Sequence, residues 1–180
     1  MRSIHNVLTV ILLCCIATTV STYASAEVDS IASYTGVYVY AGGQAQQTAR
    51  KSAVDNVVEQ MNVLIRGLAR RNLLKATEPW QRITVGVSGK NLTLNRGGGV
   101  PATVALEGPA VSFSNGFAGR SSVRRRFAKG SIIEVIDDGT SSRTNMFSLS
   151  SAGKILSVGS RIRSPHLPQD VVFRFSYKRQ

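Results

Sequence analysis

The second half of the chain alternates apolar and polar residues in short runs. Nine such runs follow residue 81, and turn-forming pairs such as Asn115-Gly116 and Asp138-Gly139 separate them. One earlier run, from Gly36 to Gly43, alternates Val and Tyr before a glycine pair. Short runs joined by tight turns are typical of an antiparallel meander, so we predict about ten strands. The nine later runs cover residues 82–87, 91–95, 102–107, 110–114, 122–128, 131–136, 145–150, 154–163 and 170–179.

A segment with helical periodicity lies between the first strand and the meander, from about residue 46 to residue 75. Its apolar residues recur at steps of three and four, so they share one face of a helix. Pro79 ends the pattern, and Gly67 is a candidate break within it. The shared face consists of Ala49, Ala53, Val54, Val57, Val58, Met61, Leu64, Ile65 and Leu68.

These patterns predict a mainly β domain with one helical segment, of the α+β class. An antiparallel meander of about ten strands can close into a barrel or curl into a half-barrel. The helix follows the first strand and must bury its apolar face, either by capping the barrel mouth as a lid or by filling the barrel. A position on a membrane surface is disfavoured, because the basic residues of this segment gather at one end.

Strand alternation also assigns side chains to the two faces of the sheet. In the run 122–128 the inward face carries Arg125 between two apolar neighbours, whereas in the last run it is wholly apolar. Burial of an isolated charge in a barrel interior carries a desolvation penalty on the order of several kcal/mol. The inward sets are Val123, Arg125 and Phe127 in the first of these runs, and Val171, Phe173, Phe175 and Tyr177 in the other.

Four arrangements would relieve this cost at Arg125. Glu134 alternates onto the inward face of the neighbouring run and can form an internal ion pair. Backbone carbonyls can accept hydrogen bonds from the guanidinium. The guanidinium can instead bind the carboxylate or phosphate of a ligand. A β-bulge would turn the side chain outward. The sequence leaves these alternatives open.

The first 26 residues have the pattern of a secretory signal peptide. Arg2 and His5 precede an apolar run from Val7 to Ile16, and Ala24-Ser25-Ala26 fits the small-x-small cleavage pattern. The apolar run is shorter than the ~20 residues of a membrane-spanning helix. We therefore expect cleavage after Ala26, export to the periplasm or the cell exterior, and a single domain over residues 27–180.

Cleavage would leave a strongly basic chain without thiols. Both cysteines lie in the leader, and Arg2 is its only charged residue, so the formal net charge changes from +12 to +11. Cysteine catalysis, Cys/His zinc sites and disulfides are thereby excluded in the mature chain. The positive charge predicts anionic partners, either a small acidic molecule or a surface of lipopolysaccharide or acidic phospholipid. Nucleic acid is not an expected partner of an exported protein.

The order of these elements resembles the fatty-acid-binding branch of the calycin superfamily. Gly36-Val37-Tyr38 is similar to the Gly-x-Trp signature of lipocalins in that superfamily, with tyrosine in place of tryptophan. Arg174-Phe175-Ser176-Tyr177 stands where the intracellular family has Arg-x-Tyr, and the helical segment is longer than the usual lid of the family. The resemblance implies a noncatalytic, lipocalin-like barrel that binds an apolar or amphipathic anionic small molecule of the lipid or fatty-acid type.

Two sets of side chains are candidate binding sites. An interior site for the small molecule would use Arg125, Tyr38, Tyr40, Phe127, Phe173, Phe175 and Tyr177. Alternatively, the helix fills the barrel, and outward-facing cations bind envelope polyanions through Arg120, Arg124, Arg126, Lys129, Arg161 and Arg163. His166 stands alone between two prolines, and no residues have the spacing of a catalytic or metal-binding set. We therefore expect no enzymatic activity, no metal and no cofactor.

Overall fold

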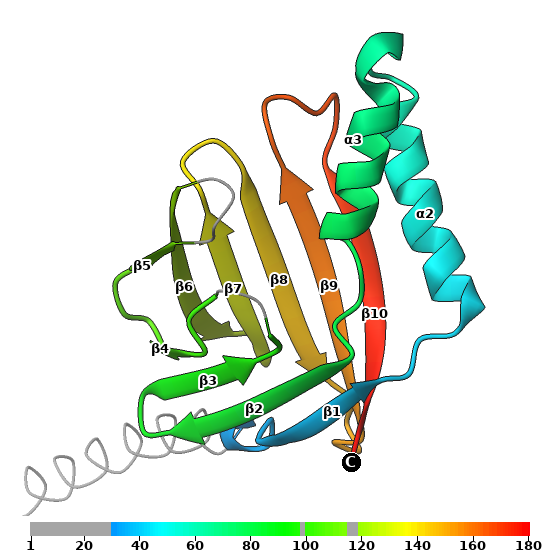
Figure 1. Ribbon diagram of the computed structural model, residues 1–180. Coiled ribbons are helices and arrows are strands. Elements are labelled where there is room, and N and C mark those ends of the chain that lie inside the picture. Colours follow the sequence, from blue (N-terminus) through cyan, green and yellow to red (C-terminus); the bar gives the residue numbers. More distant parts are fainter. Residues whose placement is uncertain (1–29, 98–99, 115–118) are drawn as a thin grey trace, which may run out of the picture.

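Ten antiparallel strands form one sheet that curls into a nearly closed barrel (Figure 1). The computed structural model describes residues 30–97, 100–114 and 119–180, so the predicted leader and the Asn115-Gly116 turn lie outside the described residues. Consecutive strands are neighbours in the sheet except β4 and β5, which are its two edges, and the first strand pairs with the last. The strands are β1 (Gly36–Tyr40), β2 (Arg82–Ser88), β3 (Asn91–Asn95), β4 (Thr103–Ala105), β5 (Val111–Ser114), β6 (Arg120–Ala128), β7 (Ser131–Asp137), β8 (Ser142–Leu149), β9 (Ile155–Arg163) and β10 (Val171–Arg179).

The predicted fold class and meander are confirmed, because each of the nine alternating runs overlaps one strand. The element order that the calycin resemblance implied, with helices after the first strand, is confirmed as well. Closure comes from the chain after β4. Leu106 forms a parallel bridge with Arg125 of β6, and the backbone N–H of Glu107 donates to the carbonyl of Arg125 at 3.0 Å.

The helical segment differs from its prediction. It consists of two helices, α2 (Gln44–Val58) and α3 (Val63–Ala76), and the chain turns at residues 59–62. Asn62 caps α3, because its side chain accepts a hydrogen bond from the backbone N–H of Leu64. Gly67 lies inside α3 and does not break it. A helix tolerates the ~1 kcal/mol cost of one glycine, whereas the N-cap fixes where the second helix begins.

The two helices pack at one end of the barrel, with α2 against β10 (Figure 1). The buried residues of α2 are Arg50, Val54, Val57 and Val58, whereas α3 has no fully buried residue. The prediction that the apolar face of residues 46–75 is buried is therefore wrong for Leu64, Ile65 and Leu68, which lie in the first turns of α3. Leu64 and Leu68 are 89% and 55% exposed. Periodicity shows which residues share a helix face, but the length of the sheet decides how much of that face is covered.

The inward side chains of β6 to β10 form transverse rows, because directly paired residues lie side by side on one face. Nearest the helices is the row Val123, Ile136, Arg143, Ile162 and Val171. The next row, which we call the polar row, is Arg125, Glu134, Asn145 and Ser160, with Phe173 at its end. Below it lies an apolar row of Phe127, Ile132, Phe147, Val158 and Phe175.

Candidate functional site

The polar row owes its register to the β6–β7 hairpin. Lys129 and Gly130 have φ angles of 52° and 68°, as a two-residue hairpin turn requires. Ala128 then pairs with Ser131, and three residues further from the turn Arg125 stands directly opposite Glu134. The local turn therefore brings Arg125 and Glu134 together as an internal ion pair, one of the arrangements predicted for Arg125.

Arg125 is almost completely buried and has an acceptor for every donor. Its Nε and one terminal nitrogen contact the Glu134 carboxylate at 3.0 and 2.9 Å. The other N–H groups donate to backbone carbonyls of Leu92, Pro101 and Ala102. A guanidinium has five N–H donors, and these contacts account for all of them. Arg125 thus joins β6 to β7, to β3 and to the segment before β4.

Glu134 supplies the carboxylate that two interior arginines contact. It accepts hydrogen bonds from Arg96 at 3.0 Å, from Arg125, and from the side-chain amide of Asn145 at 2.9 Å. Burial alone would raise the pKa of its carboxyl, but Arg96 and Arg125 outweigh burial and hold that pKa below its usual value. Glu134 is therefore ionised over the physiological pH range.

Trp80 contacts Arg96 and Arg143 at the end of the barrel where the helices pack, which we call the open end. The guanidinium carbons of Arg96 and Arg143 are 4.6 and 4.8 Å from its ring. Trp80 also stacks on Phe147 of the apolar row, with ring centroids 6.5 Å apart. Cation–π contacts of this kind contribute about 0.5–2 kcal/mol each, and they place two positive charges on one aromatic surface.

Arg143 differs from Arg125 in its acceptors. It donates to Asn145 Oδ1 at 3.0 Å, to the Ala76 carbonyl at the end of α3 at 2.9 Å, and to Ser160 Oγ at 3.4 Å. All three acceptors are neutral, and Arg143 forms no ion pair with a carboxylate of the described residues. Burial, followed by repulsion from Arg96, lowers the pKa of Arg143 to about 10.

The barrel interior thus has an excess of positive charge. Arg96, Arg125 and Arg143 share the single carboxylate of Glu134. Arg50, which is 7% exposed, lies nearby under the helices and donates to the Leu74 carbonyl and the Thr77 hydroxyl. Buried charges of one sign are costly unless an opposite charge is close. Among the described residues, Arg143 beside Trp80 forms no ion pair, and neither does Arg50 of α2.

The sequence matches no family model and no curated protein. Among solved structures, it is similar to lipid binding protein 8 of Caenorhabditis elegans, with 12% identity, 82% of this chain and 96% of that chain covered, and a TM-score of 0.45. It is likewise similar to fatty-acid-binding protein 1 of Echinococcus granulosus, with 10% identity, 82% and 97% covered, and a TM-score of 0.45. These structural neighbours are lipid-binding and fatty-acid-binding proteins. Similarity at this level establishes neither family membership nor a shared ligand.

The residues predicted to form an interior binding site do not all lie together in the barrel. Tyr38, Phe173, Phe175 and Tyr177 are buried, whereas Tyr40 and Phe127 are partly exposed. Tyr38 lies beside Arg179, which contacts its hydroxyl at 2.6 Å, and away from the polar row. Tyr40 packs edge-on against Phe175 and Tyr177, and Phe173 lies 5.5 Å below the guanidinium of Arg143. Their contact with a ligand stays a prediction.

The predicted polyanion residues are all exposed on the described surface, but they do not form one patch. Arg161 and Arg163 both lie near Asp170, at 3.7 and 3.2 Å. Arg124 and Arg126 line a hollow on the outer face of β6 and β7, together with Glu107.

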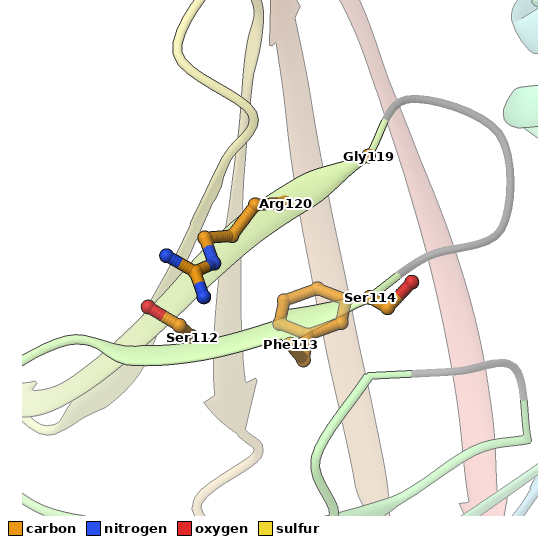
Figure 2. A pocket seen from close by; sticks show the side chains of 5 residues that line it. All are labelled: Ser112, Phe113, Ser114, Gly119 and Arg120. Carbon is orange, nitrogen blue, oxygen red and sulfur yellow. The ribbon is translucent and has the colours of Figure 1, made fainter.

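Arg120 lines a separate hollow on the β5–β6 hairpin, where Figure 2 shows its guanidinium reaching toward Ser112. Lys129 lies in the turn at the far end of β6. Polyanion binding by these residues stays a prediction.

Sequence reasoning missed the residues that gather at the open end. The alternation rule would have placed Arg143 inward if the run beginning at Asn145 had been extended back to Ser142, where β8 begins. No comparable signal marks Arg96, which follows β3 in the sequence, or Trp80, which lies in the connection after α3. Both reach the interior only because the barrel closes.

Proposed function

We propose that the protein is a noncatalytic binding protein for an amphipathic anion of the fatty-acid type. The negative group of the ligand binds Arg143 on the side next to Trp80, and its apolar part contacts the partly exposed apolar residues around the open end. Ile136 and Ile162, the direct strand neighbours of Arg143, and Leu73 of α3 belong to this apolar rim.

The observation that carries this proposal is the unbalanced charge of the interior. Arg143 is held between neutral acceptors, and burial, followed by repulsion from Arg96, lowers its pKa to about 10. A carboxylate at this position would supply the missing opposite charge and accept charge-assisted hydrogen bonds from the guanidinium. Arg125 is less suitable as an anchor, because protein acceptors already occupy its donors.

Trp80 provides a direct measurement, because it is the only tryptophan of the chain and lies 4.8 Å from Arg143. We expect a long-chain fatty acid to change its fluorescence in a saturable way, and the fatty alcohol of the same chain length to bind more weakly. A hydrogen bond to a charged group contributes about 1.5–3 kcal/mol, so the preference for the acid should be roughly tenfold to hundredfold.

The variant Arg143→Met tests the anchor, and Arg161→Met on the outer face is its matched control. The preference for the acid should disappear in the first variant and persist in the second. Equal affinity of the wild-type protein for acid and alcohol, or an unchanged preference in Arg143→Met, would contradict the proposed function.

We also propose that the protein acts after export, with residues 1–26 removed. The sequence pattern of the leader supports this, and so does a basic chain whose cysteines lie only in the leader. Intact mass measurement of the protein from the periplasm or medium of the producing cells should give a chain that begins at Glu27. A protein that retains its first 26 residues in the cytoplasm would refute export.

A further inference from the structure

The first turns of α3 expose an unusual amount of apolar surface. Val63, Leu64, Ile65 and Leu68, which we call the α3 tip, are 70%, 89%, 48% and 55% exposed. They include the two most exposed large hydrophobic side chains of the described residues. Single exposed apolar residues are common on soluble proteins, whereas a contiguous group marks an interaction site.

The fold does not need the α3 tip for its own stability. The later half of α3 packs on the core through the partly buried Ala69, Leu73 and Leu74. The turn between α2 and α3 extends beyond the ends of β9 and β10, so the sheet offers no surface that could cover the tip (Figure 1). Asn62 caps the helix at this point, which keeps the tip helical and holds its side chains outward.

Basic side chains accompany the α3 tip. The sequence of α3, VLIRGLARRNLLKA, contains Arg66, Arg70, Arg71 and Lys75 and no acidic residue. One of these basic residues, Arg70, forms an ion pair with Asp55 of α2 at 3.0 Å. Arg66 donates to the Met61 carbonyl at 2.9 Å, a neutral acceptor, and is exposed. Apolar and cationic groups are thus combined on one short protruding helix.

We infer that the α3 tip is a docking site for a bilayer surface that contains anionic phospholipid. The apolar side chains of the tip enter the region between headgroups and acyl chains, while Arg66 and Arg71 contact lipid phosphates, as in interfacial amphipathic helices. Charge complementarity selects this occupant. A second copy of the chain would bring two α3 helices of the same positive charge together, which repulsion opposes.

The docking is peripheral and is independent of the interior anion site. In the described part of the chain, no helix is long and apolar enough to cross a membrane. The helix α3 has 14 residues, and its later half is held against the barrel. Binding should therefore be reversible and should weaken as salt screens the arginines, over a Debye length of about 10 Å at 0.1 M salt.

Sedimentation with phospholipid vesicles tests the inference. We expect the protein to bind vesicles of phosphatidylcholine and phosphatidylglycerol, and to bind vesicles of phosphatidylcholine alone at least about tenfold more weakly. The double variant Leu64→Gln/Leu68→Gln should lose binding to the anionic vesicles by at least about tenfold. Both side chains are exposed, so circular dichroism and the melting temperature should not change.

Two matched controls make the test specific to the α3 tip. The variant Val172→Thr changes an apolar side chain that is 54% exposed on the outer face of β10, and it should bind like the wild type. The variant Arg66→Gln/Arg71→Gln should weaken binding more than Arg124→Gln/Arg126→Gln, which removes the same charge from β6.

Three results would overturn the inference. The first is that the wild-type protein does not bind the anionic vesicles. The second is that the two charge variants lose binding equally, because the attraction would then come from net charge alone. The third is a dimer in solution that Leu64→Gln/Leu68→Gln dissociates, because the tip would then be covered by a second copy.

Discussion

Arg125 and Arg143 point into the same barrel from strands of the same sheet, but their surroundings differ. Arg125 contacts a carboxylate and three backbone carbonyls, and its five donors are all used. Arg143 has three neutral acceptors, and a second guanidinium, that of Arg96, contacts the same Trp80 ring. The first is built as a structural crosslink, whereas the second has the charge and the contacts expected of a ligand anchor.

The strand position of an inward arginine does not by itself reveal the function of that arginine. Direction into the barrel follows from alternation and is the same for both residues. What distinguishes them is the set of acceptors that other parts of the chain bring near them. The carbonyls around Arg125 come from β3 and the segment before β4, and the Ala76 carbonyl at Arg143 comes from α3.

Loss of the shared carboxylate should have the largest effect. Glu134→Gln leaves Arg96 and Arg125 without an opposite charge in the interior, and breaking a buried ion pair in this way costs up to about 5 kcal/mol. Urea unfolding should show this decrease in the free energy of unfolding, with the exposed Glu78→Gln as the unaffected control. A cost near that of the control would mean that solvent already screens the interior charges.

Removal of Arg125 should cost less, about 3 kcal/mol. Arg125→Met takes the donors from the carbonyls of Leu92, Pro101 and Ala102, but Glu134 keeps its ion pair with Arg96. The loss should appear in urea unfolding without a change in the preference for a fatty acid over its alcohol. If that preference disappeared instead, Arg125 would be the ligand anchor.

Acid should destabilise the barrel through Glu134. Its pKa is lower in the folded protein than the ordinary value of about 4.3, so its ion pairs stabilise the fold fully above that value. This stability is lost as the pH falls through the folded pKa, at about 1.4 kcal/mol for each unit by which the pKa is lowered. Unfolding measured from pH 6 down to pH 2 should show the loss, and Glu134→Gln should lack this part of it.

Replacement of Arg143 should have the smallest effect on stability. Arg143→Met leaves no carboxylate unpaired and relieves the repulsion with Arg96, so the free energy of unfolding should change by no more than about 1 kcal/mol. The same variant should lose the preference for an anionic ligand. A stability loss as large as that of Arg125→Met would remove the distinction between the two arginines.

The sequence determined the strands, their order and their faces. Alternation and turn residues are local, so they put Arg125 and Glu134 on the inward face of neighbouring strands and predicted the apolar inward face of β10. The tertiary structure decided everything that depends on distant contacts. Arg96 meets Glu134 and Trp80 only because the barrel closes, and the α3 tip is exposed only because the helices extend past the sheet. A local pattern fixes the direction of a side chain, whereas closure of the chain in space decides what that side chain contacts.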